Sequence, residues 1–181
     1  MKSTLPTMTL TLTGIALAVG AILGVVHYAT EKPIEQAVAK AKDAAMGEIL
    51  PPFDSYAAGE TNSEGLTLYT ATKDRQPVGY AVDAYSDNGF GGRISIVAGF
   101  DTTGVLTGYR VMSHAETPGL GAKMDEWFRE SGTGHDVIGS SAPLKVTKDG
   151  GDVDAITGAT ITSRAFAEAI NKAREALPQK R

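Results

Sequence analysis

A hydroxyl-rich segment near the C-terminal end is the part of this sequence best suited to chemistry. It begins at Asp154, contains a Gly158-Ala159 pair, and has hydroxyl side chains at Thr157, Thr160, Thr162 and Ser163. A helix is predicted to follow, and the first N–H groups of a helix favour an anion such as phosphate. Small residues let a bulky group approach the backbone, and a threonine hydroxyl can bind a phosphate or be esterified to one. Capping of the helix by Thr162 or Ser163, with Gly158 in a turn, also explains these residues.

A second segment, residues 113–123, connects a predicted strand to a predicted short helix. It reads Ser-His-Ala-Glu-Thr-Pro-Gly-Leu-Gly-Ala-Lys. Pro118-Gly119 predicts a turn, and Gly121 leaves the backbone uncovered, as a flat ligand needs for contact with N–H and C=O groups. An ordinary strand–helix connection fits the same residues. Lys123 is either a partner for an anionic ligand or a solvated helix charge, and His114 is predicted to be structural.

A third glycine-rich block, residues 88–92, reads Asn-Gly-Phe-Gly-Gly and precedes a predicted strand. A structural turn is favoured here over ligand contact. Trp127 is predicted to lie in the core or at an interface rather than to stack on a cofactor, and Arg93 has no assigned role.

Composition excludes several functional classes. The chain has no cysteine, which excludes disulfides and Cys-ligated zinc or iron–sulfur centres. Its three histidines argue against a His-rich metal site, and its net charge of −4 argues against nucleic-acid binding. The phosphate-binding loop of nucleotide hydrolases is absent. Residues 149–154 lack the turn glycine and closing glutamate of a calcium loop. We therefore predict no metal site and no self-contained catalytic residues.

The N-terminal region predicts a membrane anchor. Met8–Ala29 is an apolar run of 22 residues, which as a helix is about 33 Å long and crosses a bilayer core of about 30 Å. A cleaved signal peptide fits poorly, because the run exceeds the usual apolar length and residues 27–30 lack a suitable cleavage site. We therefore expect an uncleaved helix whose threonine hydroxyls, at positions 9, 11 and 13, bond back to the backbone.

Charges next to this run predict its orientation and the organisation of the chain. Lys2 and the α-amino group precede the helix, whereas Glu31 and Lys32 cancel each other after it. The positive-inside rule then places the N-terminus in the cytoplasm and the remainder outside, at the inner membrane of a bacterium. The expected parts are a cytoplasmic start and transmembrane anchor at 1–30, a stalk helix at 31–50 that starts anew at Pro33, and an extracytoplasmic domain at 51–181.

Residues 51–181 predict an α+β domain with an antiparallel-rich sheet and flanking helices. Runs rich in Val, Ile, Thr and Tyr predict strands at Leu66–Thr72, Val78–Ser86, Arg93–Phe100 and Val105–Ser113, with Leu144–Lys148 as a fifth candidate. Asp101–Gly104 predicts a hairpin turn. Helical spacing predicts a short helix at Lys123–Glu130 and a longer one at Ser163–Leu177, with one apolar face formed by Phe166, Ile170, Ala173 and Leu177.

The hydroxyl-rich segment resembles the flavinylation motif of the FMN-binding domain family, Asp-x-x-[Ser/Thr]-Gly-Ala-[Thr/Ser]-x-[Ser/Thr]. The matching positions are Asp154, Thr157, Gly158, Ala159, Thr160 and Thr162. His-Ala-Glu-Thr-Pro-Gly-Leu-Gly, within residues 113–123, is similar to a second signature block of the same family. Residues 88–92 are similar to its Gly-Tyr/Phe-Gly-Gly turn, so the likeness extends over 88–163.

The resemblance implies a covalent FMN cofactor. In that family the FMN phosphate is esterified to the last Thr of the Gly-Ala-Thr core, which is Thr160 here. A separate flavin transferase, using FAD and magnesium, makes the bond. The flavin ring of the family packs against the second block. The implied cofactor-site residues besides Thr160 are Thr157, Gly158, Ala159, Glu116, Thr117, Gly119, Leu120 and Lys123, with Asp154 and Thr162 completing the motif.

The anchor, stalk and domain together resemble the G subunits of Rnf-type complexes. That likeness implies an electron relay in a membrane ferredoxin:NAD⁺ oxidoreductase that moves Na⁺ or H⁺, with other membrane subunits and the flavin transferase as partners. The chain would then belong to an enzyme only as one subunit. Alternatives are a C subunit of the Na⁺-translocating NADH:quinone reductase, which is usually longer, a stand-alone membrane-tethered flavoprotein, or a flavin-free anchoring module.

Overall fold

The computed structural model describes residues 5–178, which form two compact units that divide between Ala41 and Lys42. One helix, α1 (Leu5–Ile49), supplies the first unit and the opening turns of the second. Lys2, which carries much of the orientation argument, lies outside the described residues.

Helix α1 contains the predicted apolar run. Within residues 5–178 it is the one helix long and apolar enough to cross a membrane. The hydroxyls of Thr9 and Thr11 donate hydrogen bonds to the carbonyls four residues earlier, at 3.0 and 2.8 Å. These bonds confirm the expectation for two of the three threonines, because a hydroxyl paired in this way is tolerated in an apolar medium.

Pro33 does not start a new helix. It lies inside α1, which continues without a break to Ile49 and ends just before Pro51-Pro52. A proline inside a helix removes one backbone hydrogen bond, but its fixed φ is close to the helical value. The Ala-rich stretch that follows favours continued helix, so the loss is local. The predicted anchor and stalk are therefore parts of one helix.

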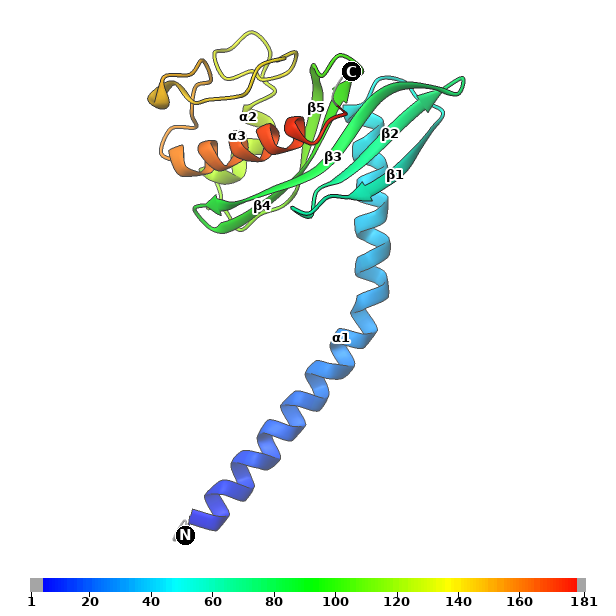
Figure 1. Ribbon diagram of the computed structural model, residues 1–181. Helices are drawn as coiled ribbons and strands as arrows, with labels where there is room; N and C mark the ends of the chain where they lie inside the picture. Colours follow the sequence, from blue (N-terminus) through cyan, green and yellow to red (C-terminus); the bar gives the residue numbers. More distant parts are fainter. Residues whose placement is uncertain (1–4, 179–181) are drawn as a thin grey trace. The chain divides into compact units, whose positions relative to one another are not determined.

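The second unit is built on a five-stranded antiparallel sheet in which every strand pairs with its neighbour in sequence (Figure 1). The strands are β1 (Ser55–Thr61), β2 (Thr67–Lys73), β3 (Gln76–Gly89), β4 (Gly92–Asp101) and β5 (Leu106–Ser113). The other elements are α2 (Met124–Trp127), α3 (Thr160–Glu175) and the 3-10 turns η1 (Gly121–Lys123) and η2 (Thr147–Asp149). This arrangement confirms the α+β class, four of the predicted strands and both predicted helices.

The fifth strand is not the predicted one. Leu144–Lys148 forms only an isolated bridge, between Val146 and Val153. The fifth position is taken by β1, whose sequence Ser-Tyr-Ala-Ala-Gly-Glu-Thr is poor in β-branched residues. Because β1 lies at the sheet edge and is mostly exposed, it shows no clear alternation of buried and exposed positions.

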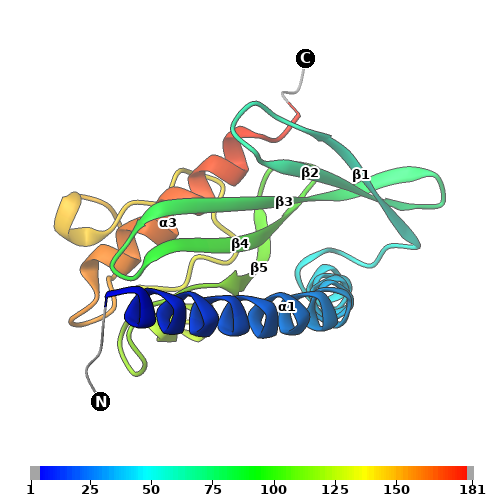
Figure 2. The same cartoon turned by 90° about the horizontal axis from the view of Figure 1, so that it is seen from below.

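Apolar clusters cover both faces of the sheet. On one face, α3 runs along β3 and β4 (Figure 2) and inserts Phe166, which stacks on Phe128 at a centroid distance of 4.3 Å. On the other face, Met46 and Ile49 from the last turns of α1 join a separate cluster that includes Val97. Adjacent strand residues point to opposite faces, so the central strands are buried on both sides.

Two glycines make room for the end of α1. A Cβ at Gly99 would lie 2.4 Å from the carbonyl oxygen of Ile49, and one at Gly108 would lie 2.9 Å from its Cα. The hydroxyl of Thr107 donates a hydrogen bond to that same carbonyl. The helix backbone therefore contacts the sheet backbone directly, and a larger residue would separate the two.

We predict that Gly99→Ala lowers the free energy of unfolding by about 1–3 kcal/mol, because the added methyl overpacks a backbone contact. Gly47→Ala is the matched control, since a Cβ at Gly47 meets nothing within 4 Å and alanine favours the helix. Urea unfolding of the full chain in detergent measures both. Equal stability of the two variants would contradict the packing described here.

Candidate functional site

A cavity of about 400 Å³ lies where the three glycine-containing blocks meet. Phe90 comes from the β3–β4 turn, residues 116–121 from the loop after β5, and residues 158–162 from the start of α3. The complete lining is Phe90, Glu116, Thr117, Leu120, Gly121, Lys148, Gly158, Ala159, Thr160, Ile161 and Thr162. Cavities of this size hold small-molecule ligands. Six of the predicted cofactor-site residues and the motif residue Thr162 lie in the wall.

Glu116 is the buried polar centre of this cavity, with only 5% of its surface exposed. Its Oε1 accepts a hydrogen bond from the backbone N–H of Gly91, at 2.9 Å. Its Oε2 accepts one from the hydroxyl of Thr162, at 2.5 Å. One carboxylate therefore joins the β3–β4 turn, the loop after β5 and the first turn of α3.

Neighbouring glycines are required by this arrangement. A Cβ at Gly89 would lie 2.6 Å from Oε1 of Glu116, and a Cβ at Gly121 would lie 2.7 Å from Oε2. A Cβ at Gly91 would meet the carbonyl oxygen of Ala115 at 2.1 Å. The glycines that suggested turns and bare backbone are thus explained by close packing around one carboxylate. The N–H of Glu116 also donates to Nδ1 of His114, at 3.1 Å, which supports a structural role for that histidine.

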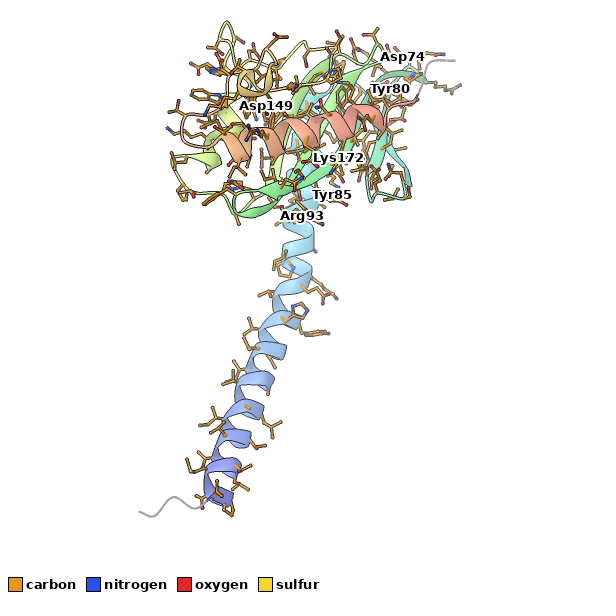
Figure 3. All side chains as sticks on the ribbon, turned by 60° about the vertical axis from the view of Figure 1, so that its left-hand side comes forward. Asp74, Tyr80, Tyr85, Arg93, Asp149 and Lys172 are labelled. Carbon is orange, nitrogen blue, oxygen red and sulfur yellow. The ribbon has the colours of Figure 1, made fainter. Side chains whose placement is uncertain are left out.

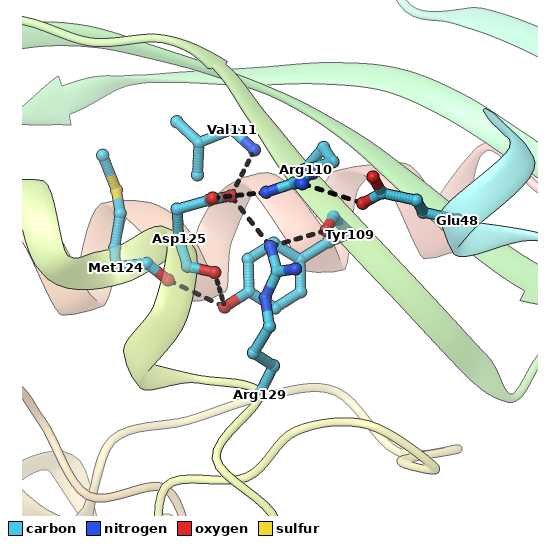
Figure 4. A network of polar contacts seen from close by, with 7 residues as sticks. All are labelled: Glu48, Tyr109, Arg110, Val111, Met124, Asp125 and Arg129. Carbon is cyan, nitrogen blue, oxygen red and sulfur yellow. Dashed lines mark hydrogen bonds and ion pairs between the residues drawn. The ribbon is translucent and has the colours of Figure 1, made fainter. Parts of the chain in front are cut away.

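The loop between β5 and α2 is attached to the sheet at both ends. Asp125, in α2, accepts hydrogen bonds from the backbone N–H of Val111 at 3.0 Å and from the guanidinium of Arg110 at 2.8 Å (Figure 4). Both partners lie in β5, the strand from which the loop departs. Arg110 also forms an ion pair with Glu48 at 2.8 Å. Because α2 is held against β5, the loop that contains Glu116 has little freedom.

Tyr109 adds a second attachment for the same helix. Its hydroxyl donates to the carbonyl of Met124 at 2.7 Å, and burial raises its pKa above the ordinary value. Arg129 lies against the Tyr109 ring, with its guanidinium carbon 5.0 Å from the centroid. The phenol therefore stays protonated and remains a hydrogen-bond donor over the physiological pH range.

The start of α3 differs from the predicted capping arrangement. The helix begins at Thr160, three residues earlier than predicted, and no side chain caps it. Thr162 is inside the helix with its hydroxyl turned to Glu116, and the hydroxyl of Ser163 donates back to the carbonyl of Ala159 at 2.9 Å. Capping by either residue is therefore wrong, because both hydroxyls have other partners.

Thr160 is half-buried and forms part of the cavity wall. Its Oγ1 accepts a hydrogen bond from Nζ of Lys148, at 2.9 Å. Gly158 has a positive φ of 78°, and a Cβ there would contact Leu120 at 3.4 Å. A non-glycine residue would be strained in that conformation, so the Gly-Ala pair gives Thr160 its place beside the loop after β5.

Some predicted site residues lie outside the cavity lining. Gly119, Lys123 and Thr157 are exposed and do not line the cavity. Asp154 ties its loop to a neighbouring one: its N–H donates to Gly134 at 2.9 Å, and its carbonyl accepts from the indole N–H of Trp127 at 3.2 Å. The arrangement assigns Asp154 a part in holding the segment that precedes α3.

The aromatic residues without a predicted ligand role have structural partners. Trp127 stacks on His135, at a centroid distance of 4.0 Å. Figure 3 labels Tyr85, whose ring lies between the guanidinium of Arg93, 4.2 Å from the centroid, and the ammonium of Lys172, at 5.5 Å. Neither cluster lines the cavity.

Sequence reasoning missed three contributors to the cavity wall. Phe90 was assigned to a turn, whereas Lys148 and Ile161 were not singled out at all. Lys148 immediately precedes residues 149–154. The sequence pattern of that segment was weighed only as a calcium loop, which it does not match. Within residues 5–178, no group of three potential metal ligands comes together.

Comparison with known proteins matches residues 89–175 to the FMN-binding domain family. The G subunit of the ion-translocating oxidoreductase complex of Vibrio vulnificus is 34% identical over 92% of this chain and 86% of its own length. The protein of the same name from Erwinia tasmaniensis is 34% identical over 88% and 85%. That of Salmonella typhi is 32% identical over 91% of each chain.

We predict that Glu116→Ala lowers the free energy of unfolding by about 1–3 kcal/mol, because two buried donors lose their acceptor. The control is Glu126→Ala, an exposed carboxylate on α2, for which a change within about 0.5 kcal/mol is expected. Urea unfolding of both variants, prepared without flavin, measures the difference. Equal midpoints would show that Glu116 does not join the three segments.

Proposed function

This chain belongs to the family of ion-translocating oxidoreductase complex G subunits, and we propose that it is the covalent-FMN electron carrier of such a complex. One observation supports this most directly. The threonine of the Gly-Ala-Thr core, Thr160, lies in the wall of a ligand-sized cavity together with the second signature block. A motif that served only to cap a helix would not require such a cavity.

The cavity has the chemistry that a flavin needs. Four large hydrophobic side chains are exposed among the described residues 50–178, and three of them, Phe90, Leu120 and Ile161, line this cavity. Apolar side chains suit the faces of a flat ring, whereas polar groups at the wall fix its orientation. The polar groups of the wall are the carboxylate of Glu116, the ammonium of Lys148 and the hydroxyls of Thr117, Thr160 and Thr162.

We propose that FMN is attached to Thr160 through a phosphoester made by a separate flavin transferase. The hydroxyl lies at the N-terminal end of α3, where the helix dipole and backbone N–H groups favour the phosphate. Covalent attachment also suits a cavity whose apolar rim is exposed, because an ester keeps the cofactor from dissociating into a compartment without free flavin.

Bound FMN would supply one- and two-electron chemistry, and the chain's own residues hold it in place. Glu116, with its carboxylate already bonded to Gly91 and Thr162, fixes the wall of the cavity. Because its relatives are named as subunits of an ion-translocating oxidoreductase complex, the chain is proposed as a relay between other redox subunits. The complex would couple ferredoxin:NAD⁺ electron transfer to movement of Na⁺ or H⁺.

We further propose that α1 anchors the protein in the bacterial inner membrane, with residues 51–181 on the extracytoplasmic side. Support comes from the length and apolar character of α1.

We predict that Thr160→Ala abolishes covalent flavin, because the acceptor oxygen is removed. The full chain is produced with a flavin transferase, and intact mass is measured in denaturant. The unchanged chain and the matched variant Thr160→Ser should gain the mass of one FMN less one water. A similar gain in Thr160→Ala would refute this attachment site.

We predict that the Ser131→Cys variant reacts with a membrane-impermeant maleimide in cells with a permeable outer membrane. Ser131 is exposed in the second unit, and the chain has no cysteine of its own to react. Ser3→Cys, which leaves Lys2 in place, is the control and should react only after lysis. The reverse pattern of labelling would place the domain in the cytoplasm.

A further inference from the structure

The contact between Lys148 and Thr160 carries an inference that rests on the proposed attachment of FMN to Thr160. We propose that Lys148 is a positioning residue for this modification: its ammonium orients Oγ1 of Thr160 and then pairs with the phosphodiester formed there. The lysine is not part of the flavinylation motif, and only the tertiary structure brings it to the acceptor oxygen.

The geometry of the contact suits this role. Nζ of Lys148 donates to Oγ1 of Thr160 at 2.9 Å, and both residues line the cavity. An ammonium has three donor hydrogens, so this bond leaves two for other acceptors. A phosphate on Oγ1 would bring its non-bridging oxygens next to the same ammonium, within reach of those two hydrogens.

A tight turn presents Lys148 to the start of α3. The turn η2 is followed by Gly150, with a φ of 83°, and a Cβ at Gly151 would lie 2.0 Å from the carbonyl oxygen of Lys145. The N–H of Thr147 donates to the carbonyl of Val153 at 2.9 Å, which closes the turn. The Asp-Gly-Gly run that resembled a calcium loop is therefore explained as the turn that carries this lysine.

An ion pair holds this turn against the helix that contains Thr160. Asp149, adjacent to Lys148, accepts two hydrogen bonds at 2.7 Å from the guanidinium of Arg164 on α3. Figure 3 shows Asp149 beside the N-terminal half of α3. Hydrogen bonding to Arg164 lowers the pKa of Asp149, which keeps this carboxylate ionised and bound to the arginine.

The ammonium of Lys148 is not neutralised by a nearby carboxylate among the described residues. Among the side chains that the structure describes, no carboxylate lies within ion-pair distance of its ammonium: Asp149 is bound to Arg164, and Glu116 to Gly91 and Thr162. An isolated cation beside a hydroxyl favours the developing negative charge on that oxygen, and charge-assisted hydrogen bonds to phosphate are stronger than neutral ones.

The transfer step gives this cation two tasks. Oγ1 of Thr160 forms a bond to the FMN-side phosphorus of FAD, and the pyrophosphate P–O bond on that phosphorus breaks. AMP leaves with the electron pair, and the hydroxyl proton passes to solvent. Before the step, Lys148 fixes the direction of Oγ1. After it, Lys148 faces a phosphodiester with one negative charge.

The test compares initial rates of FMN attachment to the full chain in detergent, with a flavin transferase, FAD and Mg²⁺. We expect Lys148→Met to react about tenfold more slowly, the effect of losing one hydrogen bond to a charged group. Lys148→Arg, which keeps the charge, should recover most of the rate. Lys145→Met is the matched control, because Lys145 is an exposed lysine three residues away that does not line the cavity.

Added salt separates an electrostatic role from a structural one. Because Lys148 is exposed, its charge is screened at high ionic strength. We compare the attachment rate of the unchanged chain with that of Lys148→Met. The ratio of the first rate to the second should decrease between low and about 1 M salt, where the screening length is about 3 Å. A purely structural defect would leave the ratio unchanged.

The possible outcomes are distinct for the two proposals. Equal rates for Lys148→Met, Lys145→Met and the unchanged chain would overturn the role of Lys148 and leave attachment at Thr160 intact. A Lys148→Arg variant as slow as Lys148→Met would also overturn it. Absence of any mass gain in the unchanged chain would instead overturn the proposed function itself.

A second measurement examines the attached group directly. The phosphorus-31 resonance of the diester should shift between the folded and the urea-unfolded protein, because folding brings the ammonium of Lys148 to the phosphate. In loaded Lys148→Met that shift should be reduced, whereas in Lys145→Met it should be retained. A shift unchanged in Lys148→Met would contradict the pairing.

Discussion

The buried carboxylate of Glu116 is the interaction on which the cavity depends. A buried carboxylate requires hydrogen-bond partners, because an unpaired charge in a protein interior is strongly unfavourable. Here the partners come from a hairpin turn and a helix far apart in the sequence, at Gly91 and Thr162. The hydrogen bonds of this one side chain therefore fix the relative positions of a turn, a loop and the start of a helix. The glycines around it, at 89 and 121, keep the space that the carboxylate occupies.

The sheet gives these loops a rigid base. Strands β3, β4 and β5 are covered by apolar clusters on both faces, and α2 is tied to β5 through Asp125. Electron transfer between fixed partners needs a cofactor in a defined place, and the rigid sheet gives the cavity such a place. The rim of the cavity is nevertheless exposed at Phe90 and Ile161. An open rim suits a relay that exchanges electrons, and the proposed covalent attachment would retain a cofactor that such a rim alone would hold weakly.

Much of the fold could be predicted from the sequence because the patterns are local. The length of the apolar run in α1 predicts a membrane-spanning helix, and the amphipathic pattern of α3 records which side of that helix is buried. The strands β2 to β5 are rich in β-branched and aromatic residues, and their predicted bounds agree within three residues at each end. The edge strand β1 could not be found, since residues such as Ala57, Ala58 and Gly59 carry no β signal. The prediction of a new helix at Pro33 was wrong, because local rules treat proline as a helix boundary. A long helix accommodates it.

The sequence by itself determined the apolar anchor, the order of most strands and a glycine-threonine motif whose residue types suit a phosphate. Which loops share one cavity was decided only by the tertiary structure. The sheet brings Phe90 and Glu116 to the start of α3, and a glycine turn brings Lys148 to Thr160. Hydrogen bonds between distant segments leave no periodic trace in the chain, because they depend on strand register and on where each loop returns.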